Sequence, residues 1–264
     1  MLEIKNVHKI FNPGTVNEKH ALKGVNLVLE DGDFVTVIGG NGAGKSTMLN
    51  AIAGVWPIDE GTILIDGEDV TNLPEHKRAK YLGRVFQDPM NGTAATMDIE
   101  DNLALANRRG KRRTLRTRIK SSERANYKEL LKTLGLGLED RMTSKVGLLS
   151  GGQRQALTLL MATLKKPKLL LLDEHTAALD PKTAAKVLEA TEQIVERDKL
   201  TTLMITHNMK DAIAHGNRLI MMMDGNIILD IKGEEKKKLT VEDLLHQFEK
   251  VSGQEFTSDK AILG

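Results

Sequence analysis

A glycine-rich segment between an apolar strand and a helix constrains this chain more than any other feature. Residues 39–47 read Gly-Gly-Asn-Gly-Ala-Gly-Lys-Ser-Thr and match the pattern G-x-x-x-x-G-K-[ST] at full length. The nearly all-apolar residues 34–38 predict a short buried strand before it, and residues 45–53 predict a helix after it that ends at Gly54. Glycines allow a loop to wrap its backbone N–H groups around phosphate oxygens, and a helix N-terminus adds partial positive charge. The segment therefore predicts a phosphate-binding loop.

Each residue of this loop is a candidate contact of a nucleotide phosphate. We expect Lys45 to reach the β- and γ-phosphates and the Ser46 hydroxyl to hold Mg²⁺. The full candidate set is Gly39, Gly40, Asn41, Gly42, Ala43, Gly44, Lys45, Ser46 and Thr47.

A second apolar segment supplies the acidic groups that such a loop needs. Residues 169–172 are four leucines that predict a buried strand, and Asp173 and Glu174 follow where the strand ends. We expect Asp173 to contact Mg²⁺, directly or through water, and Glu174 to polarise the water that attacks the γ-phosphate.

The order of predicted elements indicates an α/β fold. Strands and helices alternate from residue 148 to 223, which predicts a core built on a parallel sheet. The first strands predict a small antiparallel portion at the amino end, and the polar, basic stretch at about 95–150 predicts an inserted helical subdomain. We expect one ATPase domain over residues 1–232 and a short helical tail over residues 233–264.

Composition excludes several classes of function. Lys and Arg number 38 against 36 Asp and Glu, so the formal net charge is +2 and a broad polybasic nucleic-acid binder is excluded. The chain has no cysteine, which excludes disulfides, thiol catalysis and thiolate metal sites. No stretch approaches the ~20 apolar residues that cross a bilayer, and the amino end does not resemble a signal peptide. We therefore expect a membrane role only through a partner.

Leu149-Ser150-Gly151-Gly152-Gln153 opens a predicted helix about 20 residues before the Asp-Glu pair. A helix N-terminus with two glycines and a hydroxyl is a second potential anion site. The combination of L-S-G-G-Q, the loop at 39–47 and L-L-L-L-D-E resembles the ATP-binding cassette (ABC) ATPases over about residues 2–230. Residues 173–189 look most like cassettes that pair with permeases of the branched-chain amino-acid type.

The resemblance implies a P-loop NTPase (RecA-like) core in which residues 39–47 are the Walker A motif and residues 169–174 the Walker B motif. It also implies roles for residues that would not stand out alone. Gln87 resembles the glutamine of the loop that joins the core to the helical subdomain, where it contacts Mg²⁺, and His207 resembles the switch histidine at the γ-phosphate. Asp180 resembles the aspartate of the loop that reaches across a dimer, and Phe11 is the ring that would stack on adenine, unless it is a core residue.

The family further implies a function. Two cassettes, as a homodimer or as a pair with a similar subunit, would close on two ATP molecules, each held by the loop of one copy and by Ser150, Gly151, Gly152 and Gln153 of the other. The implied assembly is a transporter, most simply a bacterial importer, with permease subunits and an extracytoplasmic substrate-binding protein. The chain would then lie at the cytoplasmic face of the cell membrane, bound through the permease, with no nucleic-acid partner.

Two other functions share these motifs. One is a soluble ABC ATPase of a protein assembly, such as iron–sulfur cluster assembly, and the other is the cassette of an exporter. DNA-repair members need long coiled-coil insertions and translation members need two cassettes in one chain, and this sequence contains neither.

Two features depart from the usual family pattern. His175 stands where the family generally has proline, and we expect it either to tune the loop after Glu174 or, more simply, to face solvent. Residues 108–120 include eight basic residues in thirteen. This run is expected to be a solvated face, the alternative being an electrostatic contact with lipid headgroups or an acidic partner.

Overall fold

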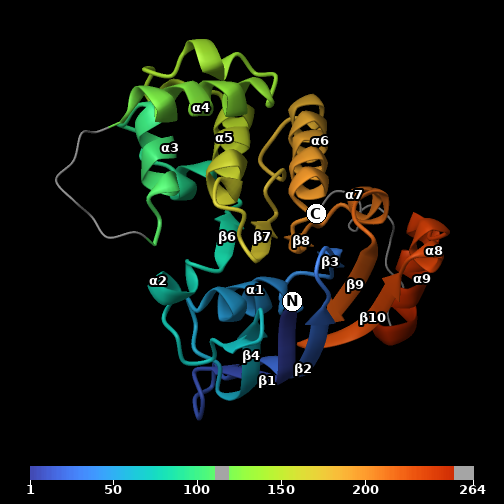
Figure 1. Ribbon diagram of the computed structural model, residues 1–264. Coiled ribbons are helices and arrows are strands. Elements are labelled where there is room, and N and C mark those ends of the chain that lie inside the picture. The colour runs from blue at the N-terminus through green and yellow to red at the C-terminus, as the bar shows by residue number, and fades with distance from the viewer. Residues whose placement is uncertain (111–118, 253–264) are drawn as a thin grey trace. The chain divides into compact units, whose positions relative to one another are not determined.

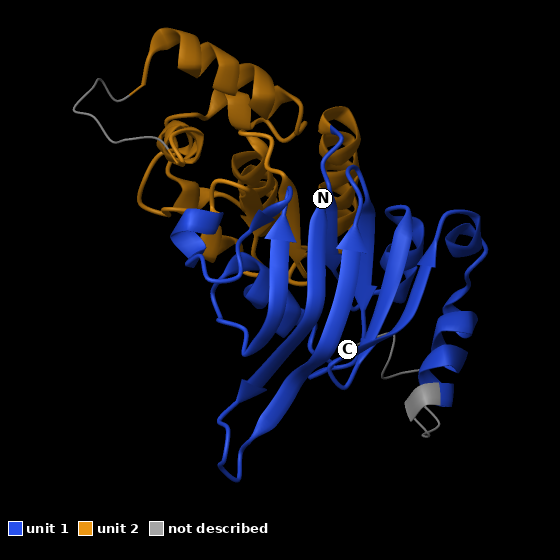
Figure 2. Ribbon diagram, turned by 60° about the horizontal axis from the view of Figure 1, so that its bottom comes forward, with its two compact units in different colours: residues 1–78, 199–264 blue, residues 79–198 orange. Residues whose placement is uncertain are grey.

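The structure is a computed structural model that describes residues 1–110 and 119–252. The chain divides into two compact units, one formed by residues 1–78 and 199–264 and the other by residues 79–198 (Figure 2). Among the described residues, none of the helices combines the length and the apolar character that crossing a membrane requires.

The first unit contains β-strands from both ends of the chain (Figure 1). Its elements are β1 (Leu2–Phe11), β2 (Lys19–Leu29), β3 (Phe34–Ile38), α1 (Lys45–Ala53), β4 (Glu60–Ile65), β5 (Glu68–Asp69), α2 (Glu75–Arg78), β8 (Thr202–Ile205), α7 (Met209–Ala214), β9 (Arg218–Met223), β10 (Asn226–Lys232), α8 (Glu234–Lys237) and α9 (Val241–Ser252).

The second unit is mainly helical, with two strands. Its elements are β6 (Leu82–Val85), the 3₁₀ turn η1 (Pro89–Gly92), α3 (Ile99–Asn107), α4 (Ser121–Lys132), η2 (Leu138–Asp140), η3 (Val146–Leu148), α5 (Gly151–Thr163), β7 (Leu169–Asp173) and α6 (Pro181–Asp198).

The predicted antiparallel portion at the amino end is confirmed. Strands β2, β1, β4 and β5 lie in that order, and each neighbouring pair is antiparallel. The pairing between β1 and β2 shifts register between Ile4 and Val7, and again further along. These irregularities are bulges, which break the strict alternation of buried and exposed residues.

The predicted parallel core is also present. Strand β3 is parallel to both β8 and β9, and all five of its residues are buried, as expected for a strand covered on both faces. Thr36 is the polar residue of this strand, and its hydroxyl donates a hydrogen bond to the Ala212 carbonyl oxygen at 2.8 Å. This strand leads directly into the glycine-rich loop.

The carboxyl-terminal helices pack on the first unit. Leu244 and Phe248 of α9 are buried with Ile38, Ala212 and Leu219 in one apolar cluster. The buried Lys236 of α8 donates hydrogen bonds to the carbonyl oxygens of His215 and Gly216, just before β9. Lys236, Leu244 and Phe248 therefore anchor the carboxyl-terminal helices in the core of this unit.

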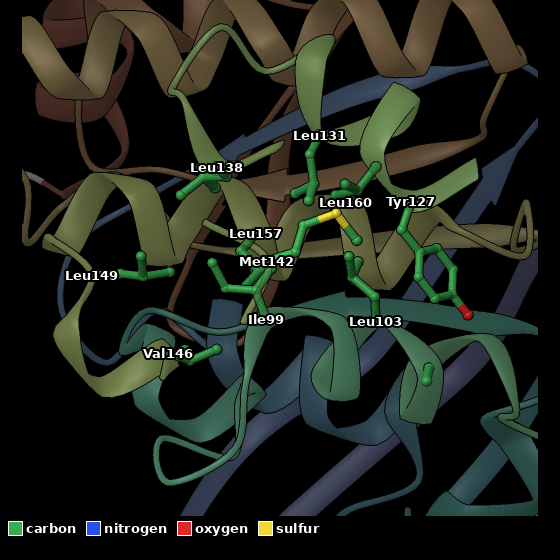
Figure 3. Packing of buried hydrophobic residues seen from close by; sticks show 11 residues of the cluster. Ile99, Leu103, Tyr127, Leu131, Leu138, Met142, Val146, Leu149, Leu157 and Leu160 are labelled. Carbon is green, nitrogen blue, oxygen red and sulfur yellow. The ribbon is translucent and has the colours of Figure 1, made fainter. Parts of the chain in front are cut away.

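The helices of the second unit share a core of their own (Figure 3). The apolar face expected around Leu131 is present, with Leu130 and Leu134 packed at its edge. Tyr127 is fully buried, and its hydroxyl accepts a hydrogen bond from the Asn107 amide at 3.1 Å. The buried set is Ile99, Leu103, Ala104, Tyr127, Leu131, Leu138, Met142, Val146, Leu149, Leu157 and Leu160.

Strands β6 and β7 are parallel, with Leu82 opposite Leu169 and Val85 opposite Leu172. The four leucines of β7 are buried and the strand ends at Asp173, which is half-buried. The fold thus brings the carboxylate pair to the carboxyl end of a buried strand, as predicted.

Candidate functional site

The backbone of the glycine-rich loop needs glycine at two positions in particular. Gly39 has φ +150°, and a Cβ there would overlap the Met222 carbonyl oxygen. Gly44 has φ +104°, and a Cβ there would lie 2.7 Å from the Ala21 carbonyl oxygen. Both positions combine a conformation that other residues rarely adopt with a close approach of another strand. The loop is therefore held tightly against its own unit.

Lys45 is the first residue of α1, and its side chain is buried inside the loop. The ammonium donates hydrogen bonds to the carbonyl oxygens of Gly39 at 2.7 Å and Gly40 at 3.1 Å. These contacts fix a positive charge within the loop, where the predicted β- and γ-phosphates would bind.

The N-terminus of α1 is arranged to receive an anion. Gly44 is its N-cap and makes no side-chain hydrogen bond, and no acidic residue occurs in the first turn. Asn41, Gly42 and Ser46 are exposed, whereas Ala43 is buried. The partial positive charge of the helix end therefore meets no carboxylate of its own first turn.

Phe11 lies at the end of β1 and is half-buried. The Trp56 ring meets it edge to face, with centroids 5.1 Å apart and an interplanar angle of 83°. The Lys9 ammonium is 5.5 Å from the centre of the Phe11 ring and is paired with Asp59 at 3.1 Å. Burial raises the pKa of Asp59, but hydrogen bonds from Ile10 and Lys9 lower it by more, so this carboxylate is well suited to anchor Lys9.

His207 follows β8 in the same unit. Thr206 just before it donates its backbone N–H to the Val37 carbonyl oxygen at 3.1 Å, and Asn208 just after it caps α7. Because β8 is parallel to β3, His207 lies at the same edge of the sheet as the start of the loop. Phe11, the loop and His207 thus belong to the same unit, with His207 and the start of the loop at one edge of its parallel strands.

In the second unit, Asp173 has a cationic neighbour that the sequence did not reveal. The Arg84 guanidinium lies 3.4 Å from the Asp173 carboxylate, and both side chains are largely buried. The sequence did contain a signal for this pair. Arg84 stands in a strand that was expected to be buried, and buried charges are usually paired with an opposite charge.

Glu174 has φ +46°, in the left-handed region that a non-glycine residue rarely adopts. Its carbonyl oxygen accepts a hydrogen bond from the Ala177 N–H at 3.0 Å, which closes a turn. Such local strain persists only where the surrounding structure holds it, and it is concentrated at functional sites.

The expectation that His175 faces solvent is wrong. Its side chain is only 2% exposed, and its Nε2 lies 3.2 Å from the Thr191 hydroxyl. Thr191 donates its own proton to the Val187 carbonyl oxygen at 2.8 Å, so His175 Nε2 is the donor to Thr191. His175 is buried because α6 lies beside the turn after β7 and offers it a partner.

Ser150 is the N-cap of α5, and the helix end is exposed. The Ser150 hydroxyl accepts from the Gln153 N–H at 3.3 Å, and the Gln153 side chain accepts from the Ser150 N–H at 3.2 Å. Gly151 is exposed, whereas a Cβ on Gly152 would overlap the Thr183 methyl group of α6. The predicted second anion site is therefore an exposed helix N-terminus that packs on α6 through a glycine.

Asp180 lies close to this helix end in the same unit. A Cβ on Gly151 would be 3.3 Å from Leu179, the residue before Asp180. The pKa of Asp180 is below its ordinary value because its side chain accepts a hydrogen bond from Thr183. The residue predicted to reach a second cassette is thus exposed and ionised beside the L-S-G-G-Q segment.

Gln87 is exposed between β6 and η1. The residue before it, Phe86, accepts a hydrogen bond at its carbonyl oxygen from the buried Gln155 side chain at 3.1 Å. Gln155 belongs to α5, so the helix that begins at Ser150 also holds the base of the segment that carries Gln87.

The donor atoms of the predicted metal residues are chemically suitable for Mg²⁺. Ser46, Gln87 and Asp173 would supply a hydroxyl, an amide and a carboxylate oxygen, and Mg²⁺ prefers such oxygens together with phosphate and water. Within residues 1–110 and 119–252, no cluster of three or more His, Cys, Asp or Glu residues could bind a metal without other ligands.

Most of the basic run 108–120 lies outside the described residues. At its beginning, Arg109 donates a hydrogen bond to the Ala162 carbonyl oxygen at 3.2 Å, and burial lowers its pKa. Arg109 is therefore a packing contact of the second unit and not part of a solvated face.

The chain is similar to known proteins along most of its length. The family described as "ABC transporter" matches residues 22–177. A tyrosine transport ATP-binding protein of Clostridioides difficile is 47% identical over 250 residues, which cover 94% of this chain and 99% of that protein. The bacitracin export ATP-binding protein BceA of Halalkalibacterium halodurans is 30% identical over 253 residues, with 93% and 94% of the two chains covered.

Solved structures show the same fold. A dimeric ATP-binding cassette in a post-hydrolysis state, bound to ADP and Pi, matches with a TM-score of 0.75 and 32% identity, covering 88% of this chain and 98% of that one. An ATP-binding cassette of an ABC transporter in its ADP conformation matches with a TM-score of 0.77 and 28% identity, over 96% and 99% of the two chains. These matches confirm the predicted P-loop NTPase core with its antiparallel β portion and inserted helices. The chain therefore belongs to the ABC transporter family, as an ATP-binding cassette that hydrolyses ATP.

Proposed function

We propose that this cassette powers a bacterial importer of amino acids, with aromatic amino acids such as tyrosine as the substrate class. The observation that carries the proposal is the 47% identity with a tyrosine transport ATP-binding protein along nearly the whole of both chains. The likeness of residues 173–189 to amino-acid-type cassettes supports it independently of that match.

The chemistry is assigned to residues of both units. The loop and Lys45 bind the phosphates, and Glu174 accepts a proton from water as the water oxygen bonds to the γ-phosphorus. The bond from that phosphorus to the bridging oxygen of ADP then breaks. Mg²⁺, held by Ser46, Gln87 and Asp173 with the phosphates, would neutralise negative charge on the phosphate chain. His207 contacts the γ-phosphate.

Two copies of the chain, or this chain and a similar cassette, form the working unit. Ser150–Gln153 of one copy binds the ATP held by residues 39–47 of the other, and Asp180 contacts the opposite copy. The exposed N-terminus of α5 and the dimeric state of the solved cassette that contains ADP and Pi support this arrangement. ATP binding would close the dimer, and hydrolysis would reopen it.

The second unit offers a surface for the permease. Met90, Leu105 and Leu148 are apolar yet 44%, 53% and 73% exposed. The buried Asn102 of α3 accepts a hydrogen bond from the Ala94 N–H at 2.8 Å and donates to the Asp98 carbonyl oxygen at 3.0 Å. The segment after Gln87 is thus fixed to α3, so a helix docked there would follow its motion. Docking would place the chain at the cytoplasmic face of the membrane.

An uptake experiment tests the proposed substrate class. Deleting the gene should abolish uptake of labelled tyrosine, and the wild-type chain, but not Glu174→Gln, should restore it. Equal tyrosine uptake in the deletion strain would contradict the proposal. Because an export ATP-binding protein is also a relative, bacitracin sensitivity is measured in parallel, and a rise in sensitivity with normal uptake would favour an exporter.

A second experiment tests the docking surface. Leu105→Glu combined with Leu148→Glu should prevent co-purification with the permease and leave ATP affinity unchanged. Val16→Glu is the matched control, since Val16 is a fully exposed apolar residue of the first unit. Retention of the permease by the double variant would contradict the assigned surface. If none of the wild-type chain were recovered in the membrane fraction, the result would favour a soluble assembly ATPase.

A further inference from the structure

Three of the four lysines in the β1–β2 strand pair form an ion pair with a carboxylate of the described residues, and Lys19 does not. Lys5, Lys9 and Lys23 each pair with a carboxylate, Lys5 with Glu3 at 2.6 Å, Lys9 with Asp59 at 3.1 Å and Lys23 with Asp224 at 2.5 Å. Lys19 is the fourth lysine of these two strands. In the part of the chain that the structure describes, no carboxylate lies within ion-pair distance of its ammonium. The neighbouring Glu18 accepts a hydrogen bond from the Gly14 N–H instead.

The Lys19 ammonium lies at the phosphate loop. A Cβ built on Gly42, in the middle of the loop, would be 3.1 Å from Lys19 Nζ. Gly42 itself is exposed, so this is the open side of the loop and not its packed side. A positive charge without a carboxylate partner therefore stands beside backbone groups that are shaped to receive an anion.

Strand register places Lys19 next to the predicted adenine site. Lys19 is paired directly with Phe11 across the two strands. One end of this strand pair therefore carries an aromatic ring for the base and an ammonium group for the phosphates.

We propose that Lys19 is a further nucleotide-binding residue, whose ammonium pairs with the phosphate chain of ATP at the outer side of the glycine-rich loop. The inference rests on the proposed role of residues 39–47. It assigns to the β1–β2 strand pair a phosphate contact in addition to its aromatic one. Lys45 supplies charge inside the loop and Lys19 supplies it at the open side, so the two should act on the same anion.

Binding measurements with the intact chain test the proposal. ATP, ADP, AMP and adenosine are titrated by calorimetry without magnesium, which prevents hydrolysis, at two salt concentrations. Lys19→Gln should weaken ATP binding by about 5- to 10-fold, as expected for one partly exposed charge pair with a highly charged ligand. The loss should decrease from ATP to AMP, vanish for adenosine, and shrink at high salt. Lys19→Arg should restore most of the affinity.

Matched variants separate the possible failures. Lys5→Gln removes the same charge from the same sheet away from the loop and should change ATP affinity less than 2-fold. If Lys19→Gln binds ATP with wild-type affinity while Lys45→Ala binds it more weakly, the proposed role of Lys19 is wrong and the phosphate-binding role of residues 39–47 is retained. If Lys45→Ala also binds normally, the proposed site itself is wrong. An equal loss for adenosine and ATP would show that Lys19 acts on the fold, which also overturns the proposal.

Discussion

Lys45 is the residue that we propose to bind the β- and γ-phosphates. Its ammonium is buried in the loop and held by two carbonyl oxygens. Hydrogen bonds to charged groups contribute about 1.5–3 kcal/mol, so Lys45→Ala should weaken ATP binding by at least about 10-fold. Calorimetry measures the affinity, with thermal unfolding as the check that the variant is folded. Unchanged ATP affinity in a folded variant would remove Lys45 from the site.

The pair formed by His175 and Thr191 supports the turn that carries Glu174. Thr191→Val keeps the shape of the side chain but leaves the buried His175 Nε2 without this acceptor. We expect a loss of about 1–3 kcal/mol in the free energy of unfolding and a lower kcat with little change in KM for ATP. Thr191→Ser retains the hydroxyl and should behave as the wild type. A fall in stability without any fall in kcat would limit the pair to a structural role.

Sequence reasoning was strong for some of these residues and weak for others. Residues 39–47 could be predicted because their chemistry is contiguous in the chain. The partner of His175 is 16 residues away on a helix, so only the fold could show that this imidazole is buried. Trp56, which packs on Phe11, follows shortly after Gly54 with no pattern to mark it.

At the scale of elements, helix α1 depends on an unusual cap. Arg78 is almost fully buried, and its guanidinium donates to the carbonyl oxygens of Ala51 at 2.7 Å and Ile52 at 2.9 Å, at the end of α1. It also donates to Leu73 and Thr71. Burial lowers the pKa of Arg78, but its ordinary value is so high that it stays charged.

Removing this cap should destabilise the first unit. Arg78→Met removes the guanidinium donor to the Ile52 carbonyl oxygen and leaves the Ala51 carbonyl oxygen with the Gly54 N–H, so we expect a loss of about 2–4 kcal/mol in the free energy of unfolding. Urea unfolding measures it, and Arg141→Met serves as a control for loss of an arginine that is exposed. Equal stability of the two variants would show that water replaces the cap.

The elements differ in how well the sequence predicted them. Helix α1 has the predicted limits, because Gly44 and Gly54 mark both ends with left-handed backbone. Strand β1 extends to Phe11 and not only to Val7, since its bulges obscure the alternation. Strand β10 was not predicted, because most of its residues are only partly buried and show no clear period.

At the scale of the whole molecule, the predicted site residues are divided between the two units. The first unit carries Phe11, the loop and His207, and the second carries Gln87, the carboxylates after β7, Ser150 and Asp180. In the proposed dimer, the exposed N-terminus of α5 would bind the ATP that the glycine-rich loop of the other copy holds. The division of the predicted site residues between the two units is consistent with this proposal.

Gel filtration of Glu174→Gln with and without Mg-ATP tests this central claim most directly. The variant keeps the proposed binding contacts but loses the proposed proton acceptor, so ATP should hold it as a stable dimer at micromolar concentration. The wild-type chain should hydrolyse ATP and elute mainly as a monomer, and the variant without nucleotide should do the same. A variant that stays monomeric in Mg-ATP and hydrolyses it at the wild-type rate would contradict the account.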